Sequence, residues 1–473
     1  MKRLITIAML LAATTLQAQV VIDKGNESRH IDDDILTGAT YIGEQQGQTL
    51  WTVHVRGGYQ IVGADHQMEP TRMHYLKIGA GEMLAATHSG DTVTLLLADR
   101  QGKNRTNVLV ARCGVTGQWT VDTLSVLAFG KKDRCLLWGA TSHSGNYIAL
   151  CTIVEFTEDK QYSAFVTLLD AGGRIVYRHE YPLGTMDQLY VTDDGRIVTL
   201  GTEADEQTLH IIVNYVDQRH AVTDDATVTC ETPREFHIAN VIGNRLIAIG
   251  TVPGTGFRGA EELCGGTLAF AYDLGIGKIA GFTIRPFHNE DINIFYNKPT
   301  KKMQRDLMCE HATSVGCIAM PYGAVMVMGR NFEKISSADN GTEEHTFSRI
   351  GLHVVAVDTA ANILWTRNVR RNDWQKGKPD LLNLGIAAMG DTLCLVKSES
   401  TRMPAAYEIG KEAKLLKMGD KSNLVLYTIT ADGEVHKDVL EAKSKHSLLH
   451  LTPKRDIITL RGSRLRHIKL SHQ

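Results

Sequence analysis

Short apolar runs alternate with polar turns along most of the chain. Seven of the runs share one layout: a turn residue, five or six β-branched or aliphatic residues, and then Gly or a polar group. Their nearly continuous apolar character predicts strands that are covered on both faces. The seven runs are DTVTLLLAD at 91, NYIALCTIVE at 146, GRIVTLGTE at 195, NRLIAIGTV at 244, GAVMVMGR at 323, DTLCLVKSE at 391 and DIITLRGS at 456.

A second pattern follows these core strands, namely an apolar strand, a turn with Asp or Gly, and another strand. It is clearest at 165–181, 268–284, 354–369 and 424–440. Successive core strands start 49 to 79 residues apart, which suits a four-stranded blade with loops of variable length. A repeated all-β unit of this size predicts a β-propeller.

The count of core strands predicts seven blades, with six or eight also open. The last repeat has only one more strand, RHIKLS, before the chain ends, so it lacks its outer part. The segment 49–65 precedes the first full repeat and has strands to spare. We expect strands from both ends of the chain to share one blade, with 49–65 completing it, because closure leaves no free edge. The alternative is that 49–65 pairs with itself.

The N-terminus has the pattern of a secretory signal peptide. Lys2 and Arg3 precede an apolar stretch from Leu4 to about Ala13, and small and polar residues follow up to Ala18. That stretch is too short for a permanent membrane anchor. We therefore expect a signal peptide at 1–18, a flexible lead-in at 19–35 and a single propeller domain at 36–473, exported to the periplasm, cell surface or medium.

Composition narrows the classes of partner. The 51 Lys and Arg residues nearly balance the 53 Asp and Glu residues, which argues against a nucleic-acid partner. The eight cysteines include no C-x-x-C pair, so no zinc or redox motif is predicted. The usual hydrolase, P-loop and metalloprotease motifs are also absent from the sequence. We predict no cofactor and no metal.

One repeat resembles the secreted bacterial propellers with delta-60 and SBBP repeats. In GAVMVMGR followed by HVVAVDTAANILWTRNV, a strand ending in Gly precedes a strand, a D-x-x-G-like turn and an I-x-W strand. Asp358, Asn362 and Trp365 match that layout, whereas Ala361 stands where Gly is usual. The other repeats match in pattern and mostly lack the Trp. The resemblance implies a fold and supplies no catalytic residue.

Loop length gives the one indication of a functional surface. In a four-stranded blade, the loops between the second and third strands open on the same face as the connections between blades. Three consecutive loops of the first kind and two connections between the same blades are long: 253–266, 331–349, 398–422, 285–314 and 370–384. Binding sites favour loops held on a rigid scaffold. The alternative is that long surface loops are simply tolerated, because the entropy cost of closing a loop grows slowly with its length.

These loops hold residue types that often anchor binding surfaces. The candidate binding residues are Arg258, His288, Asp291, Arg305, His311, His345, Arg349, Arg371, Trp374, Arg402 and Tyr407. We hypothesise a non-enzymatic binding or scaffold module for a protein or glycan of the bacterial envelope. The alternatives are a hydrolase or lyase with its site at the central channel, and a structural subunit of a larger assembly.

Overall fold

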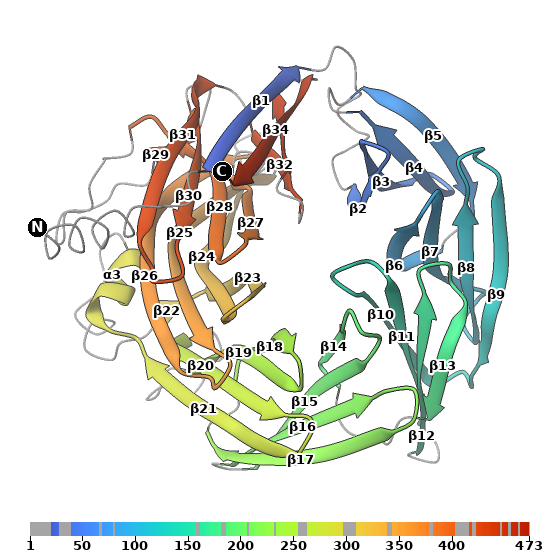
Figure 1. The fold of residues 1–473 in the computed structure, drawn as a ribbon. Coiled ribbons are helices and arrows are strands. Elements are labelled where there is room, and N and C mark those ends of the chain that lie inside the picture. The colour runs from blue at the N-terminus through green and yellow to red at the C-terminus, as the bar shows by residue number, and fades with distance from the viewer. Residues whose placement is uncertain are drawn as a thin grey trace, which may run out of the picture.

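The computed structural model is a ring of antiparallel sheets around a central axis (Figure 1). It describes residues 20–27, 39–65, 69–78, 81–157, 161–180, 186–205, 208–230, 233–253, 263–296, 309–337, 343–377, 382–402, 416–418, 422–444, 447–452, 456–461 and 464–472. The all-β propeller predicted from the sequence is confirmed.

Consecutive strands build seven sheets, each running from the axis outwards (Figure 1). The first four sheets are β2 (Thr40–Gln45), β3 (Gln48–Val55), β4 (Gly58–Ala64) and β5 (Pro70–Lys77); β6 (Glu82–Ser89), β7 (Thr92–Arg100), β8 (Arg105–Cys113) and β9 (Trp119–Ala128); β10 (Arg134–Thr141), β11 (Tyr147–Phe156), β12 (Gln161–Asp170) and β13 (Ile175–Glu180); β14 (Gln188–Val191), β15 (Ile197–Asp205), β16 (Thr208–Val216) and β17 (Ala221–Thr229).

The fifth to seventh sheets carry the extra segments of the chain. They are β18 (Glu235–Ile242), β19 (Arg245–Pro253), β20 (Leu263–Asp273) and β21 (Lys278–Pro286), with β22 (Cys309–Glu310) added to β20; β23 (Ala312–Met320), β24 (Gly323–Ser337), β25 (Glu343–Asp358) and β26 (Ile363–Lys376), with β29 (Leu416–Lys417) added to β26; β27 (Leu384–Met389), β28 (Thr392–Ser400), β30 (Ser422–Ile429) and β31 (Val435–Ser444). A short helix, α3 (Asn289–Phe295), lies between β21 and β22.

The eighth sheet joins the two ends of the chain. It contains β32 (Ser447–Leu451), β33 (Asp456–Arg461) and β34 (Arg464–His472), with β1 (Val20–Glu27) as its outermost strand. β1 is antiparallel to β34, with Val20 opposite His472 and Asp23 opposite Lys469. The expectation that both ends share one sheet is therefore confirmed.

Two details of closure differ from the prediction. The segment 49–65 forms β3 and β4 of a sheet of its own, which is the alternative left open above, so the described residues form eight sheets. The closing strand comes instead from Val20–Glu27, inside the segment expected to be a flexible lead-in. Its amides and carbonyls gain partners along β34, and this outweighs the low apolar content of the segment.

Burial follows strand position within a sheet. All seven predicted core strands are second strands, namely β7, β11, β15, β19, β24, β28 and β33. In β7 the run from Val93 to Ala98 is at most 1 % exposed, whereas the outermost strand β9 contains no buried residue. The apolar core therefore lies between the sheets, around their second and third strands.

Outer turns of one sheet dock on the preceding sheet. Trp365 of β26 donates its indole N–H to the carbonyl of Ala431, 2.8 Å away, in the β30–β31 turn of the next sheet. In the same way, Thr94 of β7 donates to the carbonyl of Ala171, 2.7 Å away, in the β12–β13 turn of the next sheet. Ala361 has a φ of 61°, the left-handed conformation for which Gly is usual, and it is fully buried. The layout that contains Asp358, Ala361 and Trp365 therefore makes contacts between neighbouring sheets.

Candidate functional site

The sixth sheet extends beyond the others as a long hairpin, which we call the arm. It consists of residues 331–337 of β24 and 343–349 of β25, and β26 continues beside it up to Lys376. These residues fall largely in the segment expected to be a loop at 331–349. The segment folds as strands because its backbone pairs in continuous register from Asn331 opposite Arg349 to Ser337 opposite Glu343.

One edge of the arm lacks a partner strand in the described part of the chain. β23 pairs with β24 only as far as Arg330 opposite Ala312, and Asn331 then donates to the carbonyl of His311. From Phe332 to Ser337, no strand in the described part of the chain pairs with this edge. Ile335 on this edge is 57 % exposed. An exposed strand edge with an apolar side chain is a surface to which another chain can add.

Neighbouring long segments brace the base of the arm. β29 pairs in parallel with β26, through Asp373 opposite Leu416. β22 pairs with β20 of the fifth sheet, and α3 packs against β25 and β26. The described long segments of the fifth, sixth and seventh sheets therefore lie on one face of the disc, which we call the long-loop face; they are α3, β22, the arm and β29.

A buried ionic network fastens α3 to the sixth sheet. Asp291 is 2 % exposed and His353 is fully buried. The Asp291 carboxylate accepts from Nη1 of Arg285 and from the His288 amide, each over 2.9 Å, and its other oxygen lies 3.2 Å from Nδ1 of His353. Asn368 donates to Asp291 over 3.2 Å and accepts from Nδ1 of His353 over 2.7 Å.

This environment lowers the pKa of both titratable partners. Burial alone would raise the pKa of Asp291, but His353, the His288 amide and Arg285 together bring it below its usual value. Burial lowers the pKa of His353, and Asp291 and Asn368 only partly oppose that effect. A neutral imidazole that donates from Nδ1 is the form that fits, because the Asn368 and Asp291 oxygens face Nδ1 and the Arg285 guanidinium faces Nε2.

A second buried cluster lies at the base of the arm. Glu399 accepts from Nζ of Lys397 over 3.1 Å and from the Tyr427 hydroxyl over 2.7 Å, and it also pairs with Lys437. Lys397 is fully buried. Burial raises the pKa of Glu399, but the two lysines and Tyr427 outweigh burial and lower it. The hydrogen bonds and ion pairs to this carboxylate stabilise its ionised form.

Asp373 differs from Glu399 although it lies in the same cluster. It is 1 % exposed, and neither of its carboxylate oxygens has a hydrogen-bond partner among the described residues. Burial raises its pKa, against the attraction of Lys397 and Arg371. Burial also lowers the pKa of Arg371 to about 10, and the Arg371 guanidinium donates to the Leu382 carbonyl. Asp373 is therefore a buried acid that resists ionisation.

We expect Asp373→Asn to stabilise the protein at neutral pH. The folded-state pKa of Asp373 lies above its unfolded value, so the ionised carboxyl destabilises the fold once the pH exceeds about 3.9. Removing that charge is expected to add about 1–3 kcal/mol to the free energy of unfolding at pH 7. The gain should shrink towards zero below pH 4. Urea unfolding at pH 3.5 and pH 7 measures it, and an equal gain at both pH values would contradict this assignment.

The structure brings five of the sequence-predicted residues into two groups, and the other three described ones lie apart from these groups. His288 and Asp291 line a pocket of about 660 Å³ between β21, α3 and β26. Arg349 and Arg371 lie close to one another beside Asp373, and Trp374 is the next residue of β26. His345 is on the arm, paired with Glu333. His311 has a φ of 58° at the turn before β23, and Arg402 is exposed just after β28. Arg258, Arg305 and Tyr407 lie outside the described residues.

Several residues of these networks were missed from the sequence. They are Arg285, His353, Asn368, Asp373, Lys397 and Glu399. Three of them can be recognised in the sequence: His353 interrupts the apolar run GLHVVAV, and Lys397 and Glu399 end the run DTLCLVKSE. A polar residue inside a strand that is covered on both faces must find buried partners.

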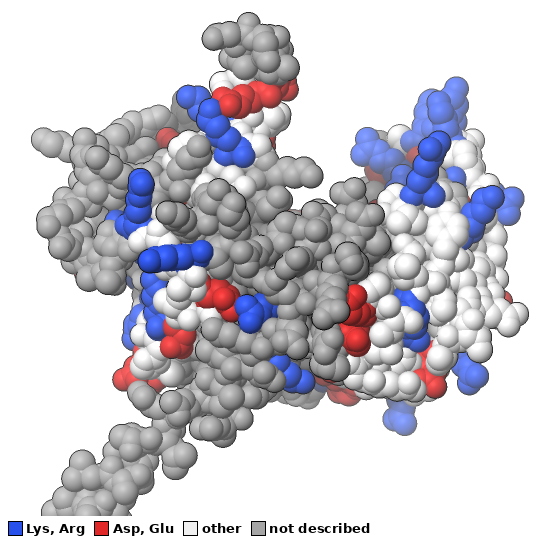
Figure 2. All heavy atoms as spheres, turned by 90° about the horizontal axis from the view of Figure 1, so that it is seen from above, with Lys and Arg blue, Asp and Glu red and all other residues white. Residues whose placement is uncertain are grey.

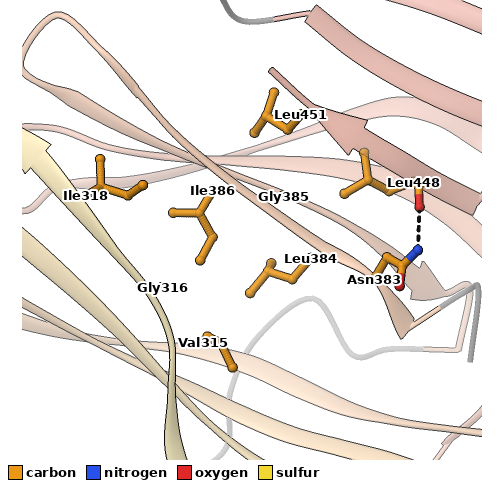
Figure 3. Close-up of a pocket in the computed structure, with 9 residues that line it drawn as sticks. All are labelled: Val315, Gly316, Ile318, Asn383, Leu384, Gly385, Ile386, Leu448 and Leu451. Atoms are coloured by element: carbon orange, nitrogen blue, oxygen red, sulfur yellow. Dashed lines mark hydrogen bonds between the residues drawn. The ribbon is translucent and has the colours of Figure 1, made fainter. Parts of the chain in front are cut away.

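In the described part of the central channel, one pocket is lined mainly by apolar side chains and backbone, and a second space also has polar side chains around it. One pocket of about 510 Å³ lies between β23, β27 and β32, with Ile318, Ile386 and Leu451 around it (Figure 3). Asn383 at its edge donates to the Leu448 carbonyl over 2.9 Å. A wider space of about 840 Å³ nearby includes Asp194 and Arg196, which pair with each other over 2.9 Å. Within the described ranges, no group of three or more metal-ligating side chains occurs.

The visible surface carries both signs of charge. Figure 2 shows Lys and Arg interspersed with Asp and Glu over the described residues, and no single sign covers the view. None of the described helical segments has the length and apolar character that crossing a bilayer would require.

The chain is similar to solved structures of other proteins. No family model and no curated protein matches the chain. Among solved structures, the Dos1 propeller is 7 % identical with a TM-score of 0.43, covering 95 % of each chain. An oligogalacturonate lyase in complex with manganese is 9 % identical with a TM-score of 0.36, covering 75 % of this chain and 86 % of that one. A prolyl endopeptidase is 12 % identical with a TM-score of 0.34, covering 69 % and 48 %. The fold assignment rests on the strand order of this chain itself.

Proposed function

We propose that this protein is an exported binding or scaffold module of the bacterial cell envelope, which engages a protein or glycan through its long-loop face. The observation that carries the proposal is the arm, whose edge from Phe332 to Ser337 has no partner strand among the described residues. The buried networks around Asp291 and Glu399 hold the base of the arm rigid. A rigid base lowers the entropy cost of binding.

A protein segment suits the arm better than a glycan does. An extended peptide can add a strand to a free edge through backbone hydrogen bonds, with side-chain contacts giving specificity. Ile335 offers an apolar contact at the centre of that edge. Glu333 and Lys334 beside it are exposed and of opposite charge, so the edge favours no net charge in its partner.

Export is supported by the signal-peptide pattern at 1–18 and by the resemblance of 323–369 to repeats of secreted bacterial propellers. In the propeller, Val20–Glu27 pairs with β34, so the strand that closes the ring begins just after the expected cleavage at Ala18. Cleavage at that position would leave the ring intact.

A hydrolase or lyase at the central channel is the alternative. That activity needs acidic, basic or histidine side chains that converge on the channel with shifted pKa values. In the described part of the channel, Asp194 is paired with Arg196, and Arg196 also bonds Asn244 and the Gly243 carbonyl of the next sheet. These contacts hold neighbouring sheets together. The buried Asp291–His353 pair lies off the axis, beneath the long-loop face.

Two matched isoleucines test the proposal. Ile335 on the arm is 57 % exposed, and Ile276 is 69 % exposed in the β20–β21 turn on the opposite face. The partner is captured from envelope extract with the full chain and identified by mass spectrometry, and its affinity is then measured by calorimetry. We expect Ile335→Glu to weaken binding about tenfold or more, as for a contact worth at least 1.4 kcal/mol. Ile276→Glu should stay within about twofold.

The opposite outcome is also informative. If both variants bind the captured partner as the unchanged protein does, the arm is not the binding surface. Polysaccharides are assayed in parallel with the same two variants. A glycan whose binding is insensitive to Ile335→Glu would place the glycan site elsewhere and overturn the role given to the arm.

A further inference from the structure

Two cysteines face each other where the long-loop face joins the fifth sheet. Cys264 lies near the start of β20 and Cys309 begins β22, and they are directly opposite in the antiparallel ladder. Both side chains are fully buried in the same apolar cluster, together with Phe287 and Phe295. The ladder holds two segments that are far apart in the sequence, and one cysteine comes from each.

The antiparallel pairing of β20 and β22 places these two cysteines close enough to form a disulfide. Directly opposed residues in an antiparallel pair have Cα atoms about 4.5–5.5 Å apart, and their side chains lie on the same face of the sheet. A disulfide requires a Cα separation of about 4.4–6.8 Å. The Cys264 thiol donates to the Gly266 carbonyl and the Cys309 thiol to the Glu310 carbonyl, each over 3.4 Å. A change of side-chain rotamer in each residue would bring the two sulfurs together.

No other cysteines in the described ladders face each other. The remaining six are Cys113, Cys135, Cys151, Cys230, Cys317 and Cys394. Cys135 is opposite Val154, Cys151 is opposite Trp138 and Val166, and Cys317 is opposite Met326. The juxtaposition is therefore particular to β20 and β22.

We propose that Cys264 and Cys309 form a disulfide in the oxidised protein. One thiolate attacks an exchangeable disulfide, such as oxidised glutathione or the active-site disulfide of a thiol oxidase, and gives a mixed disulfide with release of one thiol. The second thiolate then displaces the remaining thiol. Two protein thiols are oxidised to one disulfide, and one disulfide of the oxidant is reduced to two thiols. That the bond forms in the cell rests on the proposed export, because exported compartments are oxidising.

Burial determines when the bond can form. It raises the pKa of both Cys264 and Cys309 to about 12, so neither is a reactive thiolate in the folded, reduced protein. The exchange takes place while β22 is undocked, either during folding or in a local opening of this two-residue strand. Once formed, the bond fixes the segment after α3 to the fifth sheet and so holds one side of the long-loop face.

The test uses the full chain, refolded in a buffer of reduced and oxidised glutathione and then denatured for thiol counting. We expect six free thiols out of eight, and a non-reduced peptide map in which the peptides of Cys264 and Cys309 are joined. In Cys264→Ser the joined peptide should be absent, whereas in Cys151→Ser it should persist. Eight free thiols, or a bond between other cysteines, would overturn the proposal. The chemistry is performed on purified protein, so a failure of the proposed export or binding role leaves this result unaffected.

Discussion

Replacing Asp291 by alanine is expected to lower the free energy of unfolding by about 3–5 kcal/mol. The substitution removes the one group that accepts from Arg285, His288 and Asn368 and that faces His353. His353 is fully buried, so it would lose a partner where water cannot replace it. Urea unfolding followed by circular dichroism measures the change.

An exposed pair provides the matched control for Asp291. His210 and Asp225 are 2.9 Å apart, with side chains 34 % and 51 % exposed. Asp225→Ala should cost at most about 1 kcal/mol, because solvent screens such pairs. If the two alanine variants were equally stable, the Asp291 network would not be what fastens α3 to the sixth sheet.

The same network makes the protein sensitive to acid. The pKa of His353 is lowered in the fold, so its contribution is present above the unfolded pKa of about 6.5 and is lost as the pH falls below that value. The pKa of Asp291 is also lowered, so its contribution disappears on further acidification from about pH 3.9. Both shifts have the same sign, which is opposite to that of Asp373.

Removing β1 is expected to have a comparably large effect. A chain that begins at residue 39 loses the ladder between Val20–Glu27 and β34, which contains six opposed pairs. At about 0.5–1 kcal/mol for each backbone hydrogen bond, the loss is about 3–6 kcal/mol, and the edge of β34 becomes free to associate with another chain. We expect a lower unfolding midpoint and concentration-dependent self-association in light scattering.

A cross-link checks the register of this closing strand. Asp23 is opposite Lys469, so cysteines placed at both positions should form a bond under mild oxidation. A pair at Asp23 and His467, out of register, is the control. Equal stability of the truncated and full chains, together with no cross-link at 23 and 469, would show that the ring does not close through β1.

Strands covered on both faces were the part of this fold that sequence could predict. The run from Val93 to Ala98 in β7 is almost entirely apolar because sheets pack on both of its sides. β3 of the first sheet was missed as a core strand, since Thr49, Thr52 and His54 break its apolar run. β1 was missed because VVIDKGNE has only three apolar residues, and its place depends on pairing with a strand more than 400 residues away.

Only part of the candidate site could likewise be predicted from the sequence. Loop length indicated the long-loop face, because the number of residues between predicted strands can be counted in the sequence. The sequence predicts a loop for the arm, since NFEKISS has little apolar periodicity and Glu333, Lys334 and Ile335 are exposed. The Asp291–His353 and Glu399–Lys397 pairings were beyond reach for different reasons. Asp291 and His353 come from distant segments, whereas Lys397 and Glu399 are two residues apart and meet only because both are buried on one strand.

Site-specific photo-cross-linking tests most directly whether the arm is the binding surface. A photoreactive residue replaces Lys334 on the exposed edge of the arm, and in a second protein it replaces Lys131, which is exposed in the connection from β9 to β10 on the same face of a distant sector. Each protein is produced in its native host and irradiated. We predict a discrete cross-linked partner from position 334 and none from 131. The same partner from both positions, or a partner from 131 alone, would contradict the account.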